Sequence, residues 1–136
     1  MVRNTIKYVD LMETILGNTR RPDITFYQNG RIDITSRIAK MLNLSNGDVI
    51  DVAMHNGEFM LYIRLRNSQV IGNHEARCYA SKKNSRNFRT YSKKLSKVIL
   101  AECNANKACL ASGMAIEVEP LGTAIPLITR NNLYYD

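Results

Sequence analysis

The chain of 136 residues contains no tryptophan, three cysteines, three prolines and no long apolar run. A transmembrane helix needs about 20 consecutive apolar residues, so we expect no membrane partner. The start of the chain lacks the apolar core of a signal peptide, because Lys7, Asp10 and Glu13 interrupt it. An odd number of cysteines favours reduced thiols over a disulfide framework. Together these absences predict a cytoplasmic protein.

The residue types of catalytic and metal sites do not occur at the spacings that such sites need. Cys103 and Cys109 are too far apart to form a Cys-x-x-Cys pair, and His55 and His74 do not complete a zinc pattern. The glycines mark turns rather than a phosphate-binding loop. Single carboxylates such as Asp48 are better explained as turn or capping side chains. We therefore expect no enzyme activity, no catalytic residues, no metal and no cofactor.

The net charge of +7 is concentrated in one part of the chain. Residues 67–100 carry eight basic side chains and a single acidic one, Glu75, whereas the charges of residues 23–66 balance. A solvated surface alone does not require this concentration. Cations gathered on one face attract phosphate, which makes double-stranded DNA a candidate partner. The alternative, a solubilising surface, stays open at this point.

Residues 23–66 combine strand and helix patterns. Apolar and polar residues alternate over 24–28 and 31–34, and Asn29-Gly30 between them is a strong signal for a tight hairpin. Helical spacing follows over 37–42. Alternation then returns on both sides of a turn at His55-Asn56-Gly57. These patterns predict a unit of two strands, a short helix and a second hairpin.

A similar order returns from residue 88. An extended piece leads to Ser92, which lies 57 residues after Thr35 and is placed to cap a helix. A long connection over 102–112 then precedes an expected third strand over 113–119. Chance similarity between two alternating segments is the alternative to a duplication. The expected organisation is an N-terminal amphipathic helix and basic linker (1–22), a first unit (23–66), a basic connector (67–87) and a degenerate second unit (88–136).

Residues 30–64 resemble the AbrB-like, swapped-hairpin family of bacterial transition-state regulators and antitoxins. The resemblance is carried by Gly30-Arg31-Ile32-x-Ile34-Thr35, by the helix over 37–42, and by Gly47-Asp48 followed by Ile50-x-Val52. The family commonly has proline where this chain has Thr35, and a hydroxyl of Thr35 or Ser36 can cap the helix instead.

Domains of this family usually dimerise to close a β-barrel, and the similar MraZ-type regulators carry two units in one polypeptide. The resemblance therefore implies a mainly β, α+β fold with short helices. The expected architecture is a swapped-hairpin, double-psi-like β-barrel that two ββαβ-type units close within one chain.

The resemblance also implies that basic residues of the hairpin face contact DNA. Arg31 matches the arginine of the family's first strand, and arginine is suited to bidentate contacts with guanine. Lys93 and Lys97 share one helical face. The full set of candidate DNA-binding residues is Arg31, Arg37, Lys40, Lys82, Lys83, Arg86, Arg89, Lys93, Lys94 and Lys97.

Three functions follow as hypotheses. The first is a small DNA-binding transcription regulator, acting as a one-chain pseudodimer or as a homodimer of such chains. The second is a non-catalytic adaptor or assembly protein of a phage or mobile element, which binds a protein partner through its N-terminal helix. The third is an antitoxin-like role. Salt-dependent retention on duplex DNA would favour the first, and salt-independent co-purification with a protein would favour the others.

Overall fold

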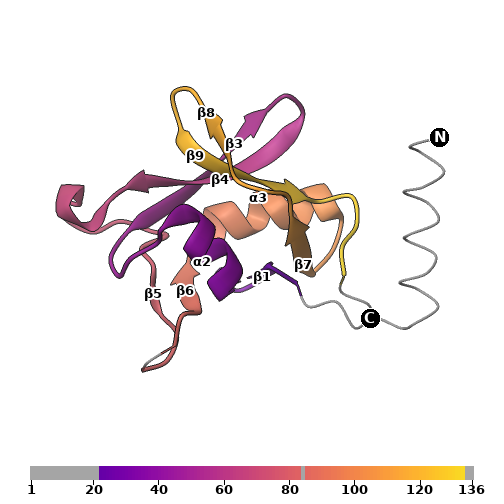
Figure 1. The fold of residues 1–136 in the computed structure, drawn as a ribbon. Coiled ribbons are helices and arrows are strands. Elements are labelled where there is room, and N and C mark those ends of the chain that lie inside the picture. Colours follow the sequence, from indigo (N-terminus) through magenta and orange to yellow (C-terminus); the bar gives the residue numbers. More distant parts are fainter. Residues whose placement is uncertain (1–21, 84, 134–136) are drawn as a thin grey trace.

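The computed structural model of the chain describes residues 22–83 and 85–133. The expected N-terminal helix lies outside the described residues. Figure 1 shows a mainly β protein with two α-helices among these residues. The elements in chain order are β1 (Ile24–Tyr27), β2 (Arg31–Ile34), α2 (Ser36–Leu42), β3 (Val49–His55), β4 (Glu58–Leu65), the 3-10 helix η1 (Asn67–Gln69), β5 (Tyr79–Ala80), β6 (Phe88–Tyr91), α3 (Lys93–Cys103), β7 (Lys107–Ser112), β8 (Ile116–Val118) and β9 (Gly122–Ile128).

All strand pairs are antiparallel, and the strands follow the order β3-β4-β9-β7-β1-β2-β6-β5, with β8 beside β9. The sheet curls into half a barrel (Figure 1). Strands from the two halves of the chain alternate in it: β1 pairs with β7, β2 with β6 and β4 with β9. Neither half forms a complete sheet without the other.

The two helices fill the space between the β3-β4-β9 part of the sheet and the part that contains β1, β2 and β6 (Figure 1). Ile38 and Leu42 of α2 and Ile99 and Leu100 of α3 are buried among the strand residues. Each fully buried aliphatic side chain stabilises the fold by about 1.5–3 kcal/mol through removal from water. The core therefore joins the two halves of the chain by packing as well as by strand pairing.

The two hairpins of the first half form where the sequence predicts them. Gly30 has φ +98°, and its N–H donates to the carbonyl oxygen of Tyr27 at 3.0 Å. At the β3-β4 turn, Asn56 and Gly57 both have positive φ, of 51° and 78°. A two-residue hairpin loop needs positive φ at both positions, which explains why Asn-Gly stands there.

The helix of the first half begins as predicted, but its cap differs from the expectation. Thr35 occupies the N-cap position without accepting a hydrogen bond from the helix. Its hydroxyl instead donates to the carbonyl oxygen of Asp23 at 2.9 Å. The first N–H of the helix, that of Ser36, donates to Oδ1 of Asn87 at 2.9 Å. In α3, by contrast, Ser92 caps as expected and accepts from the N–H of Leu95.

The expected third strand over 113–119 is present only in part, as the three-residue β8 (Ile116–Val118), and the longer strand β7 (Lys107–Ser112) precedes it. The helix α3 continues to Cys103 and ends at Asn104, which has φ 50°. The strand that pairs with β1 is β7, which lies within the predicted connection over 102–112. The residues Ala108, Leu110 and Ala111 of this strand are buried. The hydrophobicity pattern did not indicate β7, because the strand consists largely of small and polar residues. Its neighbouring strands bury it, not a strongly apolar composition of its own.

Pro126 lies inside the sheet, opposite Met60 of β4. On its other side β9 changes partner: residues 122–124 pair with β8, and 127–128 pair with β7. Proline has no N–H to donate, so it fits the position between the two partner strands. Its carbonyl oxygen accepts from the N–H of Gly113 at 2.9 Å.

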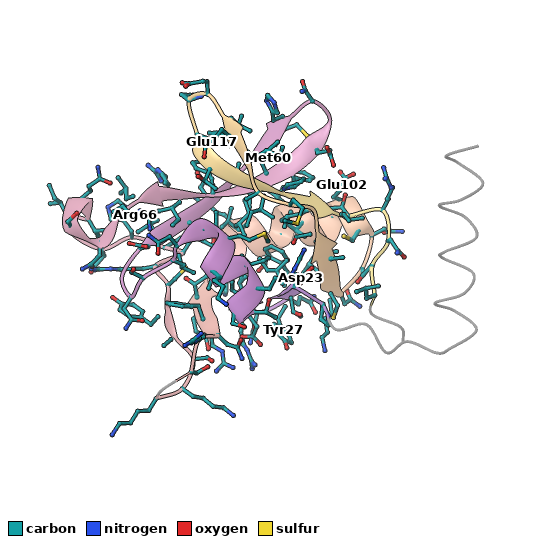
Figure 2. The ribbon with its side chains drawn as sticks, in the orientation of Figure 1. Asp23, Tyr27, Met60, Arg66, Glu102 and Glu117 are labelled. Carbon is teal, nitrogen blue, oxygen red and sulfur yellow. The ribbon has the colours of Figure 1, made fainter. Side chains whose placement is uncertain are left out.

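A buried carboxylate organises the junction between α2 and β3. Asp48 is 1% exposed and accepts hydrogen bonds from the N–H of Ser45 and the N–H of Asn67, both at 2.8 Å. Arg66, labelled in Figure 2, forms an ion pair with it at 3.0 Å and also donates to the carbonyl oxygen of Asn43 at 2.7 Å. Asp48 is thus a turn side chain, as the sequence predicts.

We predict that Asp48→Ala lowers the free energy of unfolding by about 2–4 kcal/mol, because it leaves buried donors and the Arg66 guanidinium without an acceptor. Urea denaturation followed by circular dichroism measures the change. The matched control is Glu117→Ala, since Glu117 is exposed and accepts one bond from Thr123. We expect the control to stay within about 0.5 kcal/mol of the wild type. Equal stability of the two variants would contradict the role of Asp48.

Candidate nucleic-acid interface

The convex side of β7, β1, β2, β6 and β5 carries polar and aromatic side chains. In an antiparallel sheet, successive residues alternate between faces, and directly paired residues share a face. Phe26, Ile32 and Leu110 are fully buried on the core side. The residues between the buried positions therefore form an opposite, outer face. We name this the outer face. Its strand residues are Thr25, Tyr27, Arg31, Asp33, Tyr79, Arg89, Tyr91, Lys107 and Cys109. Arg77, just before β5, contacts the ring of Tyr79 and is counted with them.

The register places these residues in rows that cross the strands. Asp33 pairs with Thr25 on one side and with Arg89 on the other, and Arg89 pairs with Tyr79. A second row lies beside it, in which Tyr27 pairs with Lys107 and Arg31 pairs with Tyr91. Tyr27 lies on the side of the molecule far from Met60 and Glu117 (Figure 2).

Asp33 stands between two arginines at the centre of the outer face. The guanidinium of Arg31 donates to both carboxylate oxygens, with Nε at 3.1 Å and Nη2 at 2.7 Å. Nε of Arg89 donates to Oδ1 at 2.8 Å. A carboxylate that accepts from two guanidiniums fixes their planes, and here it joins the two halves of the chain. Among the described residues, the two Nη atoms of Arg89 have no hydrogen-bond partner.

The titration of Asp33 reflects this arrangement. Partial burial would raise the pKa of Asp33, but the hydrogen bonds from Arg31 and Arg89 and their charges outweigh burial and hold the pKa below the ordinary value. The hydrogen bond to Asp33 correspondingly raises the pKa of Arg31. The carboxylate is therefore ionised at neutral pH and offsets one of the two arginine charges.

The tyrosines of the outer face contact its cations. The guanidinium carbon of Arg31 lies 4.7 Å from the centroid of the Tyr27 ring, and Nζ of Lys107 lies 5.1 Å from it. Arg77 lies 5.9 Å from the ring of Tyr79. Such contacts contribute about 0.5–1 kcal/mol each at exposed sites. Burial, followed by the charge of Asp33, raises the pKa of Tyr27, so its hydroxyl stays a donor at neutral pH.

Only two of the predicted DNA-binding residues, Arg31 and Arg89, lie on the outer face. Lys93 and Lys97 line a groove of about 770 Å³ between α3 and the β1-β2 turn. This groove is next to the outer face, because the backbone of Lys93 lies against Gly30 and the N–H of Ser92 donates to the carbonyl oxygen of Gly30.

The remaining predicted residues lie elsewhere. Arg37 forms an ion pair with Asp23 at 3.0 Å and donates to Oγ of Ser112, which ties α2 to β1 and β7. Lys94, in the first turn of α3, lies close to Glu75. The hydrogen bond from the Ser92 hydroxyl lowers the pKa of the Glu75 carboxyl, and Lys94 lowers it further. Four further residues are exposed: Lys40 and Arg86 beside a groove along α2, and Lys82 and Lys83 in the loop between β5 and β6.

Sequence reasoning missed eight residues of the outer face, which are Thr25, Tyr27, Asp33, Arg77, Tyr79, Tyr91, Lys107 and Cys109. A signal for part of this set was present, since Tyr27 alternates with the apolar residues of β1 and Tyr91 follows Arg89 at strand spacing. The offset of 57 residues between the two halves, which matches Ser92 with Thr35, gave the wrong partner for Arg31. That offset aligns Arg31 with Phe88, whereas the register pairs Arg31 with Tyr91.

We predict that Asp33→Asn lowers the free energy of unfolding at pH 7 by about 1 kcal/mol, because two partly exposed arginines lose the negative charge between them and one of its two acceptor oxygens. The folded-state pKa of Asp33 is depressed, so its contribution is present above the unfolded value of about 3.9 and disappears as the pH falls through the lower folded value. The difference between variant and wild type should therefore shrink below about pH 4. Urea titrations at pH 7 and pH 3 measure it. The control is the exposed Glu119→Gln, and a pH-independent difference would contradict the prediction.

No protein-family model matches the chain, and no curated protein or solved structure matches it. No helix of the described part of the chain is long and apolar enough to cross a membrane. Among the described residues, no three histidine, cysteine, aspartate or glutamate side chains gather as potential metal ligands. The chemistry of the outer face, four cations and three tyrosines around one carboxylate, is therefore the feature on which a function can be argued.

Proposed function

We propose that this protein is a non-catalytic, AbrB-like DNA-binding regulator that contacts duplex DNA through the outer face. The observation that carries the proposal is the pair of neighbouring rows in which Arg31, Arg89 and Lys107 stand among tyrosines. Cations attract the phosphate backbone, and hydroxyl groups add hydrogen bonds to phosphate oxygens. Two-stranded β-ribbons are a known way of presenting such side chains to a groove.

The two central arginines have separate parts in this proposal. Arg31 uses Nε and Nη2 on Asp33 and stacks on Tyr27, so it serves as a fixed positive charge for a phosphate. Arg89 uses only Nε on Asp33, which leaves its two Nη atoms for a DNA acceptor. Fixing both guanidiniums before binding reduces the side-chain entropy lost on association.

The pairing of the two halves supports the family assignment that we propose. Each half runs through strand, helix and strand and ends in a further strand that pairs with its counterpart, β4 with β9. We propose that residues 23–66 and 88–136 are two swapped-hairpin units linked by the connector 67–87. Linking both units in one chain keeps them at high effective concentration, so a barrel can form without a second chain.

We predict that Arg31→Ala combined with Arg89→Ala weakens binding to a fluorescent duplex of mixed sequence and lowers the slope of log K against log salt by about two, roughly one for each lost phosphate contact. Fluorescence anisotropy over 50–200 mM salt measures affinity and slope together. Lys93→Ala combined with Lys97→Ala tests whether the groove beside α3 shares the backbone contacts.

The matched control is Arg64→Ala, because Arg64 is an exposed arginine on β4, a strand outside the outer face. It changes the net charge as any single arginine variant does, and we expect the affinity to change by less than about twofold. The double variant removes two charges and Arg64→Ala removes one, so an Arg64→Ala variant that loses half as much binding free energy as the double variant would mean that the overall charge, not the outer face, attracts DNA. Binding that does not depend on salt, or no binding, would contradict the proposed function and favour a protein partner.

A further inference from the structure

The strand β3 forms an open edge of the sheet. It is the first strand in the sheet order and has β4 as its neighbour on one side only. On its other side, Ile50 donates its N–H to the carbonyl oxygen of Ala76 at 3.0 Å. Beyond Ile50, no described strand pairs with this side of residues 51–55. Within residues 22–83 and 85–133, the edge is therefore open over residues 51–55.

The backbone groups that face outward on this edge can be assigned. Pairing of β3 with β4 runs without a break from Ile50 to His55, so inward and outward backbone groups alternate along it. Because Ile50 faces outward, so do Val52 and Met54. The N–H of Val52 donates to Oδ1 of Asp51 at 2.7 Å, which is consistent with this assignment. Among the described residues, the outward backbone groups of Met54 have no partner.

The other edges of the sheet are protected in ways that β3 is not. The strand β5 has two residues and runs into a loop with Lys82 and Lys83, and β8 has three residues before Pro120. Short strands, lysine and proline are the usual means of preventing edge pairing. The open part of β3 has neither lysine nor proline, and Met54 is 57% exposed. An edge of this kind pairs readily with another strand.

We propose that β3 pairs antiparallel with β3 of a second copy of this chain, in the register that places Ala53 opposite Ala53. This register uses all the outward groups, because Val52 and Met54 then form two hydrogen-bonded pairs related by a two-fold axis. It also places Asp51 opposite His55 of the second copy, twice. A shift by two residues in either direction loses one hydrogen-bonded pair and both Asp51–His55 contacts. The edge is therefore complementary to itself in side-chain as well as in backbone hydrogen bonding, because a carboxylate accepts from an imidazole N–H.

The rearrangement on pairing involves one side chain. The carboxylate of Asp51 leaves the N–H of Val52, which then donates to the carbonyl oxygen of Met54 in the second copy. Side chains directly opposite across antiparallel strands have Cβ atoms about 5 Å apart, which is within reach of an Asp–His contact. Most of the outer face lies on β7, β1, β2 and β6, which do not border residues 51–55, and Arg77 bridges Val49 before the proposed contact begins. The dimer would present two outer faces to its ligand.

Disulfide trapping tests the register. At the central pair, Ala53 and its copy are a non-hydrogen-bonded pair with Cα atoms about 4.5 Å apart, within the range that a disulfide spans. We expect Ala53→Cys to give a covalent dimer under mild oxidation. Met54→Cys is the control, because its copies would be two residues out of register, about 7 Å along the strand. Cross-linking of Met54→Cys as readily as Ala53→Cys, or of neither variant beyond the wild type, would overturn the proposal.

A second measurement needs no cysteine. Met54→Pro removes an outward N–H from an edge position where proline is tolerated, and we expect it to weaken self-association at least about tenfold in sedimentation equilibrium. Met54→Thr keeps the N–H and should retain the dimer. Circular dichroism verifies that both variants fold. A Met54→Pro variant that folds and associates as tightly as Met54→Thr would show that β3 is not the contact.

Discussion

The antiparallel pairing of β2 with β6 is the constraint on which the rest of the structure depends. It joins the two halves of the chain within the part of the sheet that carries the outer face, with Ile32 opposite Thr90 and Asp33 opposite Arg89. Because neighbouring residues in a strand face opposite sides, one register decides both faces at once. The same pairing that buries Ile32 beside α3 brings Arg89 to the carboxylate of Asp33 on the outside. A slip by one residue would exchange the core and the outer face.

Carboxylates hold the other junctions. Asp48 joins the turn after α2 to Arg66 and to the backbone of Asn67. Asp23 accepts from the N–H of Ser112 at 2.9 Å and pairs with Arg37, so it links β1, β7 and α2. Burying a charge is costly unless it is paired and hydrogen-bonded, and each of these aspartates satisfies both conditions. The aspartates thus fix the positions of the helices relative to the strands.

The outer face brings two positive charges close together, and the carboxylate of Asp33 reduces the repulsion between them. Placing Arg31 and Arg89 close together on one sheet face is unfavourable for folding, and Asp33 offsets that repulsion while it orients both side chains. The tyrosines add contact area with few rotatable bonds. Such a surface gains little for stability, since exposed ion pairs contribute weakly, and this is why we interpret it as a binding surface.

The sequence by itself determined the local elements of the first half and the start of α3. Asn29-Gly30 and Asn56-Gly57 specify tight turns because Gly30, Asn56 and Gly57 adopt positive φ there, and Ser92 caps its helix through its own hydroxyl. Tertiary structure decided β7, whose small residues are buried by β1, and the cap of α2, which comes from Asn87 far along the chain. It also decided the outer face, because strand pairing brings both Arg31 and Lys107 to the ring of Tyr27. Pairing between distant strands depends on register, and a local pattern carries the period of a strand but not the identity of its partner.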